Sequence, residues 1–266
     1  MTSASERRTI FLEEIGVGPL WTKRDRAPMA PAAAAQADAA APAEAVEQKA
    51  QSSAWGASPE LPAVNADAPS AAEIAEMDWN QLKTAVAGCT RCDLCRSRTK
   101  TVFGTGDEKA KWLFVGEGPG RNEDLQGEPF VGPAGKLLDN MLLAMSLKRG
   151  ENAYIANIVK CRPVGADGKD RAPTADEAAA CRPYLDRQIA LLKPAIIVAL
   201  GKTAAVSLLG VDQDITVAQL RGEVKSHAGL PLVVTYHPAY LLRKPVDKRK
   251  TWSDLCLAMN AYDTKP

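Results

Sequence analysis

The sequence predicts an α/β domain in which helices cover both faces of a central, four-stranded, mainly parallel β-sheet. Short segments rich in Val, Ile and aromatic residues alternate along the chain with longer segments of helical periodicity. This alternation is typical of parallel sheets, because successive parallel strands are usually joined by a helix. The ligand site of such a sheet lies at the carboxyl ends of its strands.

Four segments are short and apolar enough to form buried strands: residues 112–116, 154–160, 195–201 and 230–236. Three segments have the pattern of helices: residues 135–147, 174–192 and 202–209. The first of these helices follows Pro133. The second opens with Thr-Ala-Asp-Glu, a capping box that satisfies backbone donors at a helix start.

Composition divides the chain into three parts. Residues 27–72 contain 20 Ala and six Pro, and the prolines interrupt any long helix, so this segment is predicted to be a disordered linker. Residues 73–266 are the predicted folded domain. Residues 1–26 form a short N-terminal segment, in which the stretch 6–21 is either a candidate docking peptide for a protein partner or a strap on the domain.

Charge and hydropathy narrow the class of protein. The predicted domain has 27 Lys and Arg against 23 Asp and Glu, a surplus that permits nucleic-acid binding without establishing it. The sequence contains no run of 18 apolar residues, the length needed to span a membrane, and its N-terminus lacks a long apolar signal region. We therefore expect a cytoplasmic protein without a membrane partner, whose cysteines are reduced and available for a metal.

Four cysteines have a spacing that favours a metal centre. Cys89 and Cys92 form a C-x-x-C pair, whereas Cys161 and Cys181 lie far downstream and each precedes Arg-Pro. A zinc ribbon normally offers two tight pairs, so this spacing counts against zinc and suits a four-iron four-sulfur (4Fe-4S) cluster. Cys95 forms a second C-x-x-C with Cys92, which leaves open which thiol near Cys92 is used.

Two glycine-rich turns follow predicted strands. The turn at 116–124 does not match the G-x-G-x-x-G dinucleotide motif, but it fixes the carboxylate of Glu117 at a sharp bend. The turn at 201–203 reads Gly-Lys-Thr and looks like the end of a phosphate-binding loop. Ile196 stands where that loop requires glycine, which excludes a nucleotide triphosphatase of this type.

Three further side chains belong to the same edge of the predicted sheet. Phe130 lies in the glycine-rich loop 127–135, Asn157 lies in the second strand, and His237 follows the last strand. Each alone is compatible with a purely structural role. Together with Glu117 they place an aromatic ring, an amide, an imidazole and a carboxylate at adjacent strand ends.

These motifs resemble those of the family 4 uracil-DNA glycosylases. The resemblance rests on Gly-Glu-Gly-Pro-Gly-x-x-Glu-Asp, Pro-Phe-Val-Gly, Asn-Ile-Val-Lys-Cys-Arg-Pro and His-Pro-Ala-Tyr-Leu-Leu-Arg, in this order between residues 89 and 262. It implies a three-layer α/β/α fold and hydrolysis of the bond between uracil and deoxyribose, which leaves free uracil and an abasic site. It also implies one 4Fe-4S cluster per chain, with four ligands: Cys89, Cys92, Cys161 and Cys181.

The resemblance assigns roles in recognising a uracil that has been flipped out of DNA. Phe130 is expected to stack on the base, and the Asn157 amide can pair with a uracil carbonyl and the adjacent ring N–H. Cytosine presents the reversed pattern and would leave buried groups unpaired. Glu123 matches the family position that excludes the methyl group of thymine, and Gly118 is expected to line the same pocket.

Bond cleavage leaves negative charge on the base and positive charge on the sugar. His237 is expected to donate a hydrogen bond to the uracil oxygen, in either protonation state. Glu117 is expected to stabilise the sugar cation, or to orient or deprotonate water.

A basic segment after His237 is the predicted DNA contact. We expect phosphate contacts from its cations, with Leu241 or Leu242 as a wedge into the base stack. The cations assigned to DNA are Arg243, Lys244, Lys248 and Arg249. A second candidate patch lies beside the first cysteine pair and comprises Arg91, Arg96, Arg98 and Lys100. Because hydrolysis transfers no electrons, the cluster is interpreted as a structural clamp for loops that face DNA.

The expected partner is uracil-containing DNA, and the protein is expected to act as a monomer associated with the nucleoid. Two alternatives remain compatible with parts of the sequence. A nonenzymatic iron-sulfur or zinc protein that binds nucleic acid would share the cysteines and cations but leave Glu117, Asn157 and His237 without a common role. A relative that crosslinks to the abasic sugar needs an added histidine, and only His227 and His237 are present.

Overall fold

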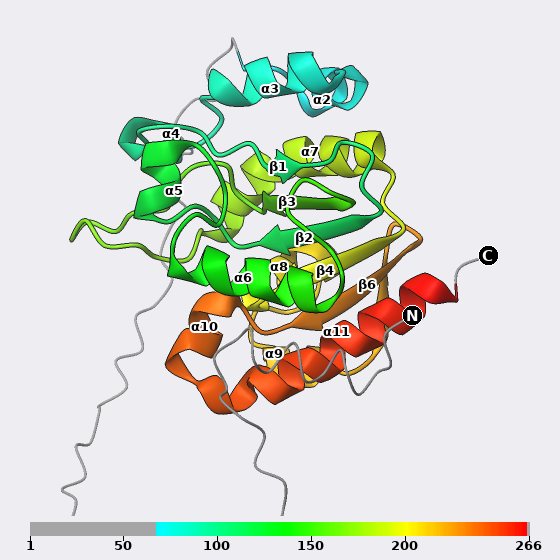
Figure 1. The fold of residues 1–266 in the computed structure, drawn as a ribbon. Coiled ribbons are helices and arrows are strands. Elements are labelled where there is room, and N and C mark those ends of the chain that lie inside the picture. Colours follow the sequence, from blue (N-terminus) through cyan, green and yellow to red (C-terminus); the bar gives the residue numbers. More distant parts are fainter. Residues whose placement is uncertain (1–67, 265–266) are drawn as a thin grey trace, which may run out of the picture.

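The computed structural model describes residues 68–264, which form a six-stranded sheet between two layers of helices (Figure 1). The strands are β1 (Thr105–Gly106), β2 (Trp112–Gly116), β3 (Ala153–Asn157), β4 (Ile196–Leu200), β5 (Val224–His227) and β6 (Leu230–Thr235). Their order in the sheet is β1-β3-β2-β4-β6-β5. The four central strands are parallel, and β1 and β5 pair antiparallel at the two edges.

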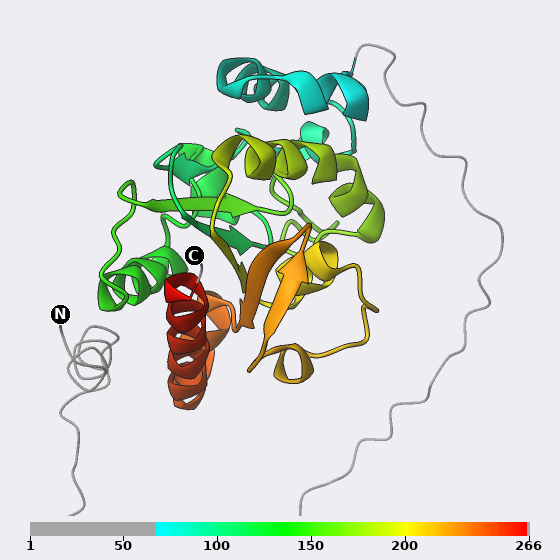
Figure 2. The ribbon, with the colours of Figure 1, turned by 90° about the vertical axis from the view of Figure 1, so that its right-hand side faces the viewer.

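The helices separate onto the two faces of the sheet. Their bounds are α2 (Ala71–Glu76), α3 (Trp79–Ala87), α4 (Leu94–Ser97), α5 (Arg121–Gln126), α6 (Pro133–Ala144), α7 (Ala175–Leu192), α8 (Lys202–Leu209), α9 (Val217–Leu220), α10 (Pro238–Arg243), the 3-10 turn η1 (Pro245–Asp247) and α11 (Lys248–Asp263). Helices α7 and α8 pack on one face, and α6 and α11 pack on the other (Figure 2).

The alternation of side chains along each strand produces two apolar cores. In β2, Leu113 and Val115 join the core that contains α7 and α8, whereas Trp112 and Phe114 join the core that contains α6 and α11. All five residues of β2 are buried, as expected for a strand covered on both faces. None of the helices within residues 68–264 is both long and apolar enough to cross a bilayer.

The predicted α/β/α fold with a parallel centre is confirmed, and the four predicted strands are its central strands. The edge strands β1 and β5 were not predicted. Helix α8 has the predicted bounds, and α7 begins after the predicted capping box at Thr174. Helix α6 begins at Pro133 and ends three residues before the predicted end at 147, because Ser146 adopts a left-handed conformation with φ 61°.

The first described helix, α2, begins at Ala71, just ahead of the domain boundary predicted at residue 73. Its N-cap residue Ser70 forms a capping box with Glu73. The candidate docking peptide at residues 6–21 and the predicted linker up to residue 67 lie outside the described residues.

Candidate active site

A cavity of about 210 Å³ opens at the carboxyl ends of the central strands. Glu117 reaches it from the turn after β2, Asn157 from the end of β3, and His237 from the turn after β6. Phe130 enters from the loop between α5 and α6. The structure therefore brings the four predicted side chains together, and the predicted pocket residues Gly118 and Glu123 line the same cavity.

Phe130 is held in an uncommon backbone conformation at the cavity wall. Its φ is 56°, a left-handed value that a residue with a side chain adopts only when its surroundings impose it. Arg149 supplies part of this restraint, because its guanidinium donates hydrogen bonds to the carbonyls of Pro129 (2.8 Å) and Phe130 (2.9 Å). The Phe130 ring stacks near the His237 ring, with 5.5 Å between centroids.

Glu123 supplies the other restraint on this loop. Its Oε1 accepts hydrogen bonds from the backbone N–H groups of Val131 (3.0 Å) and Gly132 (3.1 Å). The Glu123 carboxylate thus has a structural task in addition to the predicted one. It connects the start of α5 to the residues that follow Phe130.

Asn157 lines the cavity, and its side chain carries a buried oxygen. Its Oδ1 has no hydrogen-bond partner within residues 68–264, although the residue is only 2% exposed. A Cβ atom on Gly116 would lie 2.5 Å from this oxygen and 2.7 Å from the Phe130 ring, so only glycine permits the close approach. A buried polar atom without a partner is costly, and a ligand that donates a hydrogen bond would remove that cost.

His237 is a neutral hydrogen-bond donor in this site. Burial lowers its pKa to about 4, and the nearby Arg243 guanidinium acts in the same direction. The Nδ1 atom accepts a hydrogen bond from the backbone N–H of Ala239 at 3.2 Å. The proton of the neutral ring is therefore on Nε2, which leaves one N–H group to donate.

Glu117 has a partner that sequence reasoning missed. The hydroxyl of Thr203, at the start of α8, donates a hydrogen bond to Glu117 Oε2. The signal in the sequence is the Gly-Lys-Thr segment at 201–203, whose likeness to a phosphate-binding loop points to a different function. Asp170 and Arg171 also line the cavity and were not predicted.

The predicted DNA contacts lie on α10, η1 and α11, and the structure separates them by exposure. Arg243, Lys244 and Arg249 are exposed. Leu241 was predicted as one of two wedges but is only 1% exposed and packs in the core, so it cannot enter a base stack, whereas Leu242 is 44% exposed. Lys248, predicted to contact phosphate, is 8% exposed, which leaves little of its side chain accessible to DNA.

The second predicted basic patch also offers fewer exposed cations than the sequence suggested. Arg91 donates to the carbonyl of Ala180, and Arg98 turns inward to the cysteine loop, so both guanidinium groups are used inside the domain. Only Arg96 and Lys100 of that patch remain exposed.

A family model, described as the Uracil DNA glycosylase superfamily, matches residues 103–256. The chain belongs to this superfamily. It is similar to the "Type-4 uracil-DNA glycosylase" of Archaeoglobus fulgidus (41% identity over 64% of this chain and 85% of the relative) and to the protein of that name in Thermotoga maritima (43%, over 59% and 80%). The protein of that name in Pyrobaculum aerophilum is 39% identical over 68% of this chain and 93% of its own length.

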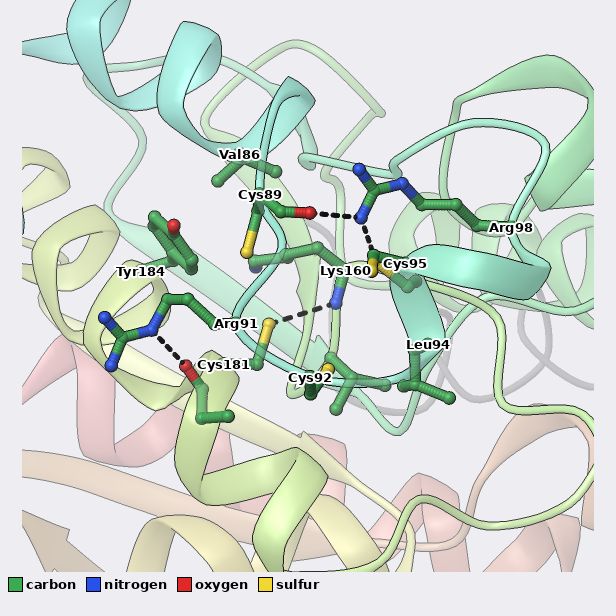
Figure 3. Close-up of a pocket in the computed structure, with 13 residues that line it drawn as sticks. Val86, Cys89, Arg91, Cys92, Leu94, Cys95, Arg98, Lys160, Cys181 and Tyr184 are labelled. Atoms are coloured by element: carbon green, nitrogen blue, oxygen red, sulfur yellow. Dashed lines mark hydrogen bonds between the residues drawn. The ribbon is translucent and has the colours of Figure 1, made fainter. Parts of the chain in front are cut away.

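Cysteines gather in a second pocket, part of which lies outside the segment matched by the superfamily model. The pocket contains five thiols, from Cys89, Cys92, Cys95, Cys161 and Cys181. Cys89 and Cys92 come from the loop before α4, Cys95 comes from α4 itself, and Cys181 comes from α7 (Figure 3). The four predicted ligands therefore share one pocket with Cys95.

Two donors point at sulfur atoms in this cysteine pocket. Arg98 Nη1 donates to Cys161 Sγ at 3.2 Å and to the Cys89 carbonyl at 2.7 Å. The backbone N–H of Lys160 donates to Cys181 Sγ at 3.3 Å (Figure 3). Burial raises the pKa of Cys161 to about 11 and that of Cys181 to about 12, while Arg98 and Lys160 oppose these shifts.

The described part of the chain contains no group of three or more side chains placed to hold a single metal ion. A 4Fe-4S cluster is larger than one ion, so thiols around it lie farther apart than the ligands of zinc. A pocket with one C-x-x-C pair, two distant cysteines and N–H donors directed at sulfur fits the chemistry of such a cluster.

Proposed function

We propose that the protein is a uracil-DNA glycosylase that hydrolyses the bond between uracil and deoxyribose in DNA, as an early step of base-excision repair. The observation that carries this proposal is the shared cavity of Glu117, Phe130, Asn157 and His237. These groups come from three strand ends and one loop, and an everted pyrimidine gives all four a task. Membership in the superfamily and similarity to three type-4 enzymes support the same function.

Recognition begins when uracil leaves the duplex, which costs a few kcal/mol. Stacking on Phe130 returns about 1–3 kcal/mol of that cost. The Asn157 side chain then pairs with the uracil ring N–H and a carbonyl, and its unpaired oxygen gains the partner it lacks. The carboxylate of Glu123 lies at the edge of the cavity, where it would exclude the methyl group of thymine.

Cleavage breaks the bond between the sugar C1′ and the base nitrogen, and the electron pair goes to uracil. The N–H of neutral His237 donates to the uracil oxygen on which negative charge grows. Glu117 stabilises the positive charge on the sugar and orients the water whose oxygen bonds to C1′. The proton that this water loses ends on the released uracil anion. His237 and Glu117 thus place a neutral hydrogen-bond donor beside the departing base and a carboxylate beside the sugar, at the two ends of the breaking bond.

DNA is held next to the cavity by α10, η1 and the start of α11. Arg243, Lys244 and Arg249 contact phosphates, and Leu242 fills the space that the flipped base leaves. The protein acts as a monomer on DNA in the cytoplasm, at the nucleoid.

Four residues of the cysteine pocket would hold one 4Fe-4S cluster: Cys89, Cys92, Cys161 and Cys181. A cluster held there would crosslink the loop before α4, the segment after β3 and helix α7, a structural contribution separate from the hydrolysis. Cys95 lines the same pocket but matches no ligand position of the family motif.

The function is tested by incubating the purified protein with an oligonucleotide that contains one uracil. We expect free uracil and an alkali-labile abasic site, with much slower release by the Glu117→Ala and His237→Ala variants. Release by the wild type no faster than by a Glu117→Ala, His237→Ala double variant would refute the proposal. A control oligonucleotide with thymine at the same position should stay intact.

A further inference from the structure

The Gly-Lys-Thr segment, which comprises the N-cap residue and the first two residues of α8, contacts both of the groups assigned to catalysis. Thr203 bonds to Glu117, and a Cβ atom on Gly201 would lie 2.9 Å from the Cβ of His237. Gly201 has φ 92° and ψ −179°, a combination that is essentially restricted to glycine. Its N–H donates to the carbonyl of Thr235 at 2.8 Å, which fixes the segment against the strand that leads to His237.

The position of Thr203 in its helix lets its hydroxyl donate a hydrogen bond to another side chain. In a helix interior, threonine often bonds its own hydroxyl to the carbonyl three or four residues earlier. Thr203 is the second residue of α8, and its hydroxyl instead donates to Glu117 Oε2. A hydroxyl has a single hydrogen, so this donation commits it to the carboxylate.

We propose that Thr203 is a positioning residue that fixes the rotamer of Glu117, so that the carboxylate faces the sugar and the water that attacks it. This inference rests on the proposed glycosylase function. The Thr203 hydroxyl occupies one carboxylate oxygen and leaves the other oxygen to face the sugar and the attacking water. A hydroxyl bonded to a carboxylate is a charge-assisted interaction, so it holds the carboxylate more firmly than a bond between neutral groups. The Gly201 side of the same segment leaves room for His237.

The test compares variants of the full chain, with its cluster, on the uracil oligonucleotide under single-turnover conditions. Thr203→Val keeps the shape of the side chain and removes the hydroxyl. We expect uracil release about 10- to 100-fold slower, the rate equivalent of a lost hydrogen bond to a charged group, with DNA affinity unchanged. Thr203→Ser keeps a hydroxyl and should restore most of the rate.

Ser207→Ala is the matched control, because Ser207 lies farther along α8 and does not line the catalytic cavity. It should release uracil at the wild-type rate. Thr203→Ala repeats the measurement with a smaller side chain, so that misfolding of one variant does not decide the outcome.

A double-mutant cycle separates positioning from general destabilisation of the fold. If Thr203 acts through Glu117, Thr203→Val should change the rate of the Glu117→Ala variant by less than about 2-fold. An equal loss in both backgrounds, or a wild-type rate in Thr203→Val, would overturn the inference. If the wild-type protein itself releases no uracil, the proposed function fails instead, so the two failures are distinguishable.

Discussion

At the scale of single residues, the site combines groups that are costly to bury with a ligand that would satisfy them. Asn157 keeps an unpaired oxygen at the cavity, and His237 stays neutral because burial opposes its charge. Both features weaken the free protein and gain value only when a base with suitable donors and acceptors enters.

The low pKa of His237 predicts how stability depends on pH. The ordinary histidine value is 6.5 and the value in the folded protein is about 4. Between these values the unfolded chain binds more protons than the folded one, so the stability present above 6.5 is lost as pH falls toward 4. Lowering the pH from about 7 to about 5 should therefore reduce the melting temperature of the wild type more than that of His237→Gln.

His227→Gln is the control for this experiment, because it makes the same substitution at the other histidine and leaves His237 in place. An equal fall in melting temperature for the wild type and His237→Gln across the same pH range would contradict the assigned pKa.

At the scale of elements, the loop that carries Phe130 depends on two clamps from outside it. Arg149→Met removes the donors to the carbonyls of Pro129 and Phe130. We expect the free energy of unfolding to fall by about 2 kcal/mol and uracil release to slow, because the strained φ of Phe130 loses a restraint. Denaturant titration and single-turnover assays measure the two effects.

Lys148→Met serves as the neighbouring control, because its ion pair with Glu151 is exposed to solvent and should contribute little to the free energy of unfolding. Equal effects from the two variants would argue against a specific clamp at Arg149.

The exposed position of Leu242 predicts that this side chain contributes to uracil release from double-stranded DNA but not from single strands. Leu242→Ala should slow uracil release from double-stranded DNA by about 10-fold and change release from single strands little, because only a duplex leaves a gap to fill. Leu143→Ala, another exposed leucine, is the control and should behave as wild type on both substrates. Equal loss on both substrates would remove the wedge role.

The sequence alone predicted the elements whose hydrophobic pattern is strong. The strands β2, β3, β4 and β6 are mostly buried and apolar, so their hydrophobic pattern was enough to predict them. The edge strands β1 and β5 were missed because β1 has two residues and β5 alternates between exposed and half-buried side chains.

The contacts between the residues of the site were harder to predict than the identity of those residues. Glu117 and His237 could be placed at strand ends by topology, whereas the bond between Thr203 and Glu117 joins residues far apart in the chain. Whether Leu241 or Leu242 faces solvent depends on the rotation of α10, which a six-residue segment does not fix.

At the scale of the whole molecule, the cysteine pocket joins the N-terminal helices to the α/β core. The proposed cluster predicts about four iron atoms per wild-type chain. Cys181→Ala should contain less iron and have a lower melting temperature, because a structural metal site contributes directly to folding. Cys256→Ala on α11, which lies outside the pocket, should keep its iron. Full iron in Cys181→Ala, or a fully active protein that contains zinc, would refute the proposed cluster.

The central claim is that four distant side chains form one pocket for an everted uracil, and a crystal structure with bound uracil tests it most directly. We predict that the base stacks on Phe130, pairs with the Asn157 amide and accepts a hydrogen bond from His237 Nε2. Uracil bound elsewhere, or an empty cavity at saturating uracil, would contradict the account.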